Sequence, residues 1–193
     1  MTIESEAKKT ARFWDNGRLG RAIFRQSLAI AFGVAVVLTN HPQEWVTWQK
    51  VLVFLLAWDL MMGAIGLITP EVRSWAERFI WRRSRGLSAF WCATHVHPWI
   101  VPLAFPALHD FRFAFGLHGG CVISALVLHR MPGRYRGPLA MLAAGMTGIV
   151  ATQRGVPAGF GWMAFIYPAK CVLCWWLPCG RLEVEPSSME STT

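Results

Sequence analysis

Four ionisable residues lie within apolar stretches of this sequence, where such side chains are costly unless they have partners. Asp59 lies in "LLAWDLMMGAIG", His95 and His97 lie in "WCATHVHPWIVPLAFP", and Lys170 lies in "IYPAKCVLCWW". An ionised aspartate at the centre of a membrane span costs at least about 2.5–3.5 kcal/mol. A carboxylate, an ammonium group and an imidazole lower this cost if they share one hydrogen-bonded cluster. We therefore predict a polar cluster that neutralises itself.

The candidate side chains are expected at one depth in the membrane. Counted from the outer ends of their apolar segments, Asp59 and His97 are 11 residues in, and His95 and Lys170 are 13 residues in. At about 1.5 Å per residue, these depths agree to within about 3 Å if the spans are straight. Thr147 in the fifth apolar segment lies at a comparable level. The predicted ligand-binding residues are therefore Asp59, His97, Lys170, His95 and Thr147.

Helical spacing separates the two histidines. Residues two apart on a helix point about 200° apart, so His95 and His97 are not expected to face one site. His97 is the stronger candidate because it adjoins a predicted break in the helix. Other interpretations stay open: Lys170 extends toward the interface, a protonated Asp59 bonds to a backbone carbonyl, and one histidine only packs.

Three prolines, Pro98, Pro102 and Pro106, follow the histidines at a spacing of four. Each removes a backbone donor, crowds the carbonyl four residues earlier and disfavours helix at the residue before it. We therefore do not expect a straight helix from Pro98 to Pro106. Non-helical backbone survives at membrane depth only inside protein or beside a cavity, and transporters build binding sites in this way. A kink that only shapes the packing is the alternative.

The composition predicts the elements that must position these residues. Apolar residues make up 54% of the 193 residues and charged residues only 16%, against about 25% in soluble domains. We predict an all-α, polytopic integral membrane bundle of about six transmembrane helices with a proline-broken third helix. The six apolar segments are Ala22–Asn40, Trp48–Thr69, Leu87–Leu108, Phe113–Leu128, Pro138–Thr152 and Pro157–Pro178.

The basic residues predict the orientation. Of the 19 lysines and arginines, 15 precede the first span or overlap its start, follow the last span or lie in alternate loops. The other side has only Lys50, Arg112 and Arg154, and Lys170 lies inside a span. The positive-inside rule then places both termini in the cytoplasm, in a bacterial inner membrane or its equivalent. Residues 1–21 are predicted as a partly amphipathic cytoplasmic segment, 22–178 as the six-helix domain, and 179–193 as a cytoplasmic tail.

The cysteines do not form a disulfide framework, because their number is five and they are scattered over three apolar segments. The string CVLC, with Cys171 and Cys174, resembles the disulfide-generating quinone oxidoreductases of bacterial membranes over these four residues. That resemblance implies a redox role for the pair. Ordinary buried cysteines are the preferred interpretation, because the predicted topology places the pair near the reducing side.

Three classes of function fit these features. The favoured class is a small transporter or channel-like protein that uses Asp59, His97 and Lys170. The second is a membrane enzyme or redox subunit that binds a quinone, haem or lipid, and the third is a structural subunit of a larger membrane complex or homo-oligomer. The sequence identifies no specific cofactor and contains no metal motif of specific spacing. The net charge of +8 points to anionic lipid head groups as partners and not to nucleic acid.

Overall fold

The structure, a computed structural model, describes residues 3–40, 45–69, 72, 87–105, 108 and 111–173. The regular elements within these ranges are all helical, which confirms the all-α class. In order they are α1 (Ile3–Asn40), α2 (Thr47–Ile68), α4 (Leu87–Thr94), α5 (His97–Ala104), α6 (Phe111–Ala114), η3 (Phe115–Gly119), α7 (Gly120–Arg130), α8 (Gly133–Gln153), α9 (Met163–Pro168) and η4 (Ala169–Leu173). The predicted tail 179–193 and most of the loop between the second and third spans lie outside the described residues.

Three helical stretches of the described chain are long and apolar enough to cross a membrane: Gly20–Thr39, Thr47–Ile68 and Phe111–Arg130. The stretch Met163–Leu173 is also apolar but shorter. Much of the stretch Gly20–Thr39 of α1 is exposed apolar surface, including Phe24 and Leu38, as expected for a helix that faces lipid. The helices thus support the predicted membrane class and are compatible with a membrane location.

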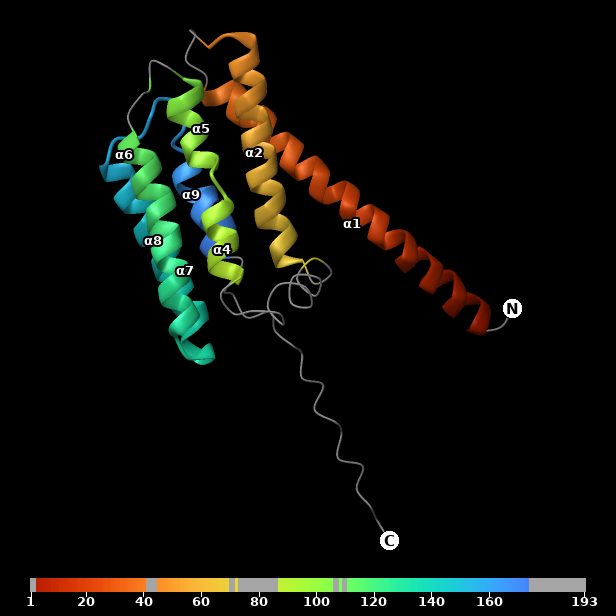
Figure 1. The fold of residues 1–193 in the computed structure, drawn as a ribbon. Coiled ribbons are helices and arrows are strands. Elements are labelled where there is room, and N and C mark those ends of the chain that lie inside the picture. The colour runs from red at the N-terminus through yellow and green to blue at the C-terminus, as the bar shows by residue number, and fades with distance from the viewer. Residues whose placement is uncertain are drawn as a thin grey trace.

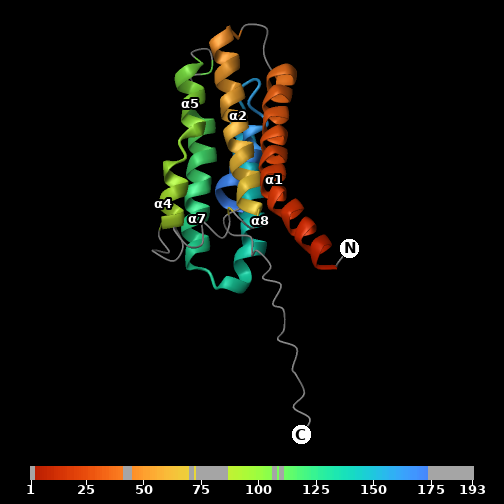
Figure 2. The same cartoon turned by 90° about the vertical axis from the view of Figure 1, so that its right-hand side faces the viewer.

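The first helix is longer than one membrane span. Its 38 residues correspond to about 57 Å, against a hydrocarbon thickness of about 30 Å. The backbone stays helical through Gly17 and Gly20, so most of the predicted N-terminal segment continues directly into the first apolar span. The N-terminal part of α1 projects away from the bundle, whereas its C-terminal part packs along α2 (Figures 1 and 2).

The helical stretch α9–η4 lies in the middle of the bundle and contacts α2, α7 and α8 (Figures 1 and 2). Its residues are accordingly among the most buried of the described chain, with Met163, Ala164 and Tyr167 fully buried. Close approach to α8 needs a glycine, because a Cβ on Gly148 would lie 2.7 Å from the Ala164 carbonyl oxygen. Lys170, which belongs to this stretch and is 6% exposed, therefore faces other helices and not lipid.

The third predicted span is broken, but at a different place from the one expected. The break lies at His95 and Val96, between α4 and α5, and the segment from His97 to Ala104 is helical. Pro98 sits in the first turn of α5, where a backbone N–H has no partner in any case. Pro102 is accommodated inside the helix. The first two prolines thus lie in a new helix that starts at His97, instead of unwinding the chain beyond the histidines.

Two of the described helices contain a π-helical turn. The first, η3, continues α6 into α7 and contains His118, and the second, η4, follows Pro168 and contains Lys170. A π-turn inserts an extra residue into the helical ladder and is frequent at functional sites. Both ionisable residues therefore lie on locally widened backbone and not on regular α-helix.

The two ends of the bundle differ in character. Arg130, Arg134 and Arg136 lie at the turn between α7 and α8, and we call the end of the bundle that holds this turn the basic end (Figures 1 and 2). At the opposite end, the rings of Trp45, Phe105 and Phe160 pack with centroids 5.0–5.3 Å apart. All three are buried, and we call this cluster the aromatic plug.

Candidate functional site

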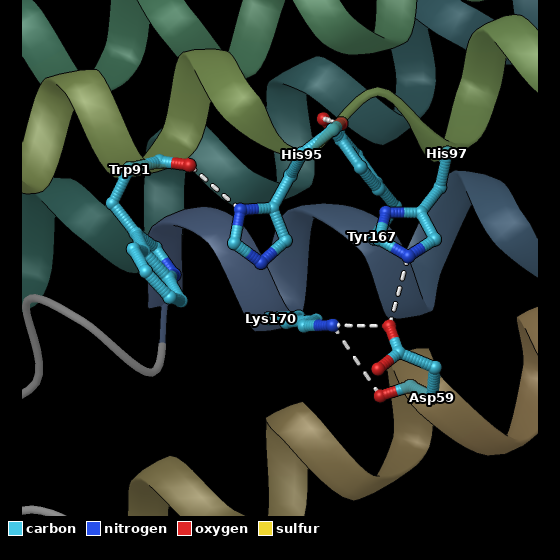
Figure 3. A network of polar contacts seen from close by, with 6 residues as sticks. All are labelled: Asp59, Trp91, His95, His97, Tyr167 and Lys170. Atoms are coloured by element: carbon cyan, nitrogen blue, oxygen red, sulfur yellow. Dashed lines mark hydrogen bonds and ion pairs between the residues drawn. The ribbon is translucent and has the colours of Figure 1, made fainter.

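Asp59 on α2 is the centre of a cluster formed by three helices (Figure 3). One of its carboxylate oxygens, Oδ2, lies 2.6 Å from Lys170 Nζ and 2.8 Å from His97 Nε2. Lys170 Nζ also donates to the Asp59 backbone oxygen at 3.3 Å. The structure therefore brings together the carboxylate, the ammonium group and the imidazole that the depth count placed at one level.

The pair of Asp59 and Lys170 is unevenly buried. The Lys170 side chain is 7% exposed, whereas the Asp59 side chain is 50% exposed because it faces a cavity. Lys170 reaches the carboxylate by passing over Gly63, where an added Cβ would lie 2.2 Å from Lys170 Cε. The missing side chain at Gly63 is thus what lets η4 supply its cation to α2.

His95 also faces the site, which corrects the expectation that only one histidine could do so. The rings of His95 and His97 are 5.7 Å apart, and both line the same cavity. The expected angle of 200° holds only for a continuous helix, and the helix is interrupted between these two residues. The break therefore brings both imidazoles to one side.

The backbone carbonyl groups that lose their helical partners at the break are hydrogen-bonded by side chains. His95 Nδ1 lies 2.6 Å from the Trp91 carbonyl oxygen, and the hydroxyl of Tyr167 donates to the His95 carbonyl oxygen at 2.5 Å. The Tyr167 hydroxyl also lies 2.7 Å from His118 Nδ1. Satisfied backbone groups of this kind are what a break in a buried helix requires.

The partners determine which ring nitrogens hold protons. A carbonyl oxygen only accepts, so His95 donates from Nδ1 to Trp91, and its Nε2 is the free acceptor when the ring is neutral. His97 donates from Nε2 to the Asp59 carboxylate, which leaves Nδ1 as the acceptor. That Nδ1 atom is buried and has no hydrogen-bond partner. The two rings therefore present opposite nitrogens as bases.

Tyr167 is a residue of the site that the sequence analysis missed. It is fully buried on α9, one turn before Lys170, and joins His118 to the broken helix. The available signal was its position three residues before Lys170 in an apolar segment, because such residues share a helix face. Tyrosine in an apolar segment reads equally well as an interfacial residue, so the signal was weak.

Thr147 does not belong to the cluster, which corrects the prediction that it does. It is buried between α7 and α8, with its hydroxyl 3.5 Å from Ser124 Oγ and its methyl group close to Gly120. It is not among the residues that line the cavity beside Asp59. Thr147 stabilises the packing of two helices, because the depth count defines its level but not the direction of its side chain.

A partly open cavity of about 450 Å³ adjoins the cluster. Asp59, Gly63, Gly66 and Leu67 line it along one face of α2, over a length of about 12 Å. The cavity thus extends from Asp59 toward the basic end. The other lining residues are Arg25, Met62, Val72, Trp91, His95, His97 and Lys170.

Arg25 is the second residue that the sequence analysis did not assign to the site. Its Nη1 donates to Thr69 Oγ1 at 2.9 Å, which joins α1 to the end of α2. Its Nε is buried and has no hydrogen-bond partner. In the sequence, Arg25 is one of several arginines that precede the first span or overlap its start, and only the packing of α1 on α2 places it beside the cavity.

We expect the change Tyr167→Phe to lower the free energy of unfolding by about 1–2 kcal/mol. It leaves the His95 carbonyl oxygen and His118 Nδ1 without their shared partner, and unsatisfied buried groups cost about 1–3 kcal/mol. Denaturant unfolding in detergent measures the loss. Tyr135→Phe is the matched control, because Tyr135 is exposed, and it should change the stability little. Equal effects of the two changes would contradict the assigned hydrogen bonds.

Comparison of the chain with protein-family models, with curated proteins and with solved structures finds no match, so its function must be argued from its own residues.

Proposed function

We propose that this protein is a small membrane transporter that takes up a solute from the basic end into the cavity beside Asp59. The observation that supports this most directly is the cavity itself, which has a carboxylate, an ammonium group and two imidazoles at its inner part. Ionisable residues at membrane depth typically mark the path of a substrate or ion. A cluster that served only for packing would leave no such space beside half-exposed Asp59.

The proposal includes six membrane crossings with both termini in the cytoplasm. The three long apolar helices supply the first, second and fourth crossings, and α4–α5, α8 and α9–η4 supply the others. In support, α8 has 21 residues, which is enough to cross, and the two remaining stretches are interrupted near Pro98 and Pro168. The basic end then faces the cytoplasm, in agreement with the positive-inside rule.

The two ends of the bundle are suited to access from alternate sides. The cavity extends toward the basic end, whereas the aromatic plug fills the opposite end. Phe105, a member of the aromatic plug, directly follows α5. In this proposal, movement of α5 about the break at His95 and Val96 opens the plug. Broken helices beside a central site perform this role in transporters.

Flux into proteoliposomes tests the proposal. The purified protein is reconstituted, and the uptake of a panel of small isotope-labelled anions, cations and zwitterions is measured. We expect at least one class to enter faster than in protein-free liposomes, and His97→Gln to reduce that uptake at least tenfold. The reason is that His97 contacts Asp59 and lines the cavity. His129→Gln, which is outside the cavity, is the matched control and should transport normally.

The sidedness of the cavity provides a second readout for the same proposal. In a background without native cysteines, Gly66→Cys should react with a water-soluble thiol reagent from the side that labels Gly133→Cys, and not from the side that labels Gly155→Cys. Labelling of Gly66→Cys from the other side would contradict the proposed access. Absence of flux for the whole panel, together with constant co-purification of partner subunits, would favour a structural role instead.

A further inference from the structure

The cavity has an excess of positive charge among the described residues that line it. Arg25 and Lys170 are cationic, and Asp59 is the single carboxylate. Asp59 already contacts both Lys170 and His97 through the same oxygen, and among the described residues Arg25 is hydrogen-bonded to a threonine hydroxyl and not to a carboxylate. A charge without a counter-ion is costly near the membrane interior, so the cavity favours an anion.

Arg25 is suited to bind an oxyanion. A guanidinium group has five donors in a planar fork that matches carboxylate and phosphate groups, and Thr69 uses only one of them. The contact with Thr69 holds the group at the end of α2. An oxyanion in the cavity would accept from the remaining donors of Arg25 and would balance its charge.

The remaining walls are apolar and define the rest of the ligand. Met62, Leu67, Val72 and Trp91 line the cavity together with Arg25 and the histidines. Its volume of about 450 Å³ lies within the range of about 300–1,000 Å³ that is usual for small organic ligands. A small inorganic anion alone would not touch these apolar walls.

We propose that the cavity binds an amphipathic organic anion, with its carboxylate or phosphate group at Arg25 and its apolar part against Met62, Leu67 and Trp91. This inference deepens the proposed function by naming its substrate class, and it rests on the same site. Binding can be measured without transport, so the two ideas fail separately. Binding without any flux would contradict the transporter, whereas flux of cations alone would contradict the anion site.

The test uses three probes of similar size that differ in charge: benzoate, benzyl alcohol and benzylamine. Each is titrated into the full-length protein in a neutral detergent, and the rise in Tm gives the apparent affinity. We expect benzoate to bind at least tenfold more tightly than the other two. Equal shifts for benzoate and benzylamine would overturn the proposal.

Variants at Arg25 then test the place of binding. Arg25→Gln should weaken benzoate binding at least tenfold, and Arg25→Lys, which keeps the charge but loses the planar fork, should weaken it less. Arg130→Gln is the matched control, because Arg130 is exposed at the same end and does not line the cavity. If Arg25→Gln does not fold, the comparison of Arg25→Lys with Arg130→Lys replaces it. Unchanged affinity in the Arg25 variants would overturn the assignment.

The anion could come from solution or from a lipid head group, and the membrane composition distinguishes these sources. Benzoate binding is repeated in nanodiscs of a zwitterionic lipid and in nanodiscs that also contain an anionic lipid. If the anionic lipid weakens benzoate binding to the wild type but not to Arg25→Gln, a lipid head group occupies the site. If benzoate binds equally in both kinds of nanodisc, the natural ligand is a soluble anion. Loss of binding that does not depend on Arg25 would contradict the inference.

Discussion

Replacing Asp59 by Asn is expected to lower the free energy of unfolding by about 3–5 kcal/mol, because it leaves the Lys170 ammonium group buried without a counter-ion. Lys170→Met should cost less, about 1–3 kcal/mol. The Asp59 side chain is 50% exposed toward the cavity and keeps His97, whereas Lys170 is 7% exposed. The larger loss should therefore come from the carboxylate.

A double-mutant cycle measures this pair directly. Asp59→Asn together with Lys170→Met should be more stable than the sum of the single effects predicts, because the double variant has no unpaired charge. The measurement is the denaturation midpoint and slope in detergent. A parallel cycle with Lys50→Met is the control, since Lys50 lies near the N-terminal end of α2, away from the cavity, and should be additive. Additivity at Lys170 as well would mean that the observed contact has no energetic value.

Gly63→Ala is expected to cost about 1.5–3 kcal/mol, the usual value of a hydrogen bond to a charged group. The added Cβ would lie 2.2 Å from Lys170 Cε and 2.7 Å from Cδ, so the end of the lysine must move. Moving a flexible side chain is cheap in itself. The cost arises because the ammonium group then leaves the Asp59 carboxylate.

Gly66→Ala is the matched control for this change, one turn further along α2. A Cβ there would meet only Val72 at 3.8 Å, an ordinary contact, so the variant should be as stable as the wild type or slightly more stable. In a Lys170→Ala background, Gly63→Ala should become harmless as well. A full cost of Gly63→Ala in that background would show that Gly63 serves helix packing and not the lysine.

Much of the architecture follows from local features of the sequence. The apolar segments predict helices, and the histidine–proline segment predicts a broken one, because backbone hydrogen bonding and proline sterics act within a few residues. The place of the break, at His95 and Val96 and not beyond Pro98, was not predicted. Pro98 disfavours helix before it but is tolerated in the first turn of a new helix, and the sequence alone does not choose between these effects.

The relative level of the polar groups along their helices was also readable from the sequence, because each helical residue adds the same rise. That count was enough to associate Asp59, His97 and Lys170, which the structure brings into contact. The same count placed Thr147 with them, although its side chain faces Ser124 between α7 and α8. The level of a residue along its helix follows from the sequence of that helix alone. A contact also requires that the side chain points toward its partner on the neighbouring helix.

The direction in which these side chains point was decided by the tertiary packing. Arg25 reaches the cavity because α1 packs on α2, and Tyr167 reaches the broken helix because α9 occupies the centre of the bundle. Both contacts join residues far apart in the chain, with separations of 44 and 72 residues. The sequence by itself predicted the membrane class, the helices and the level of the polar groups along them. Only the packing of distant helices decided which of those groups share a cavity, because the rotation of each helix is set by its neighbours and not by its own residues.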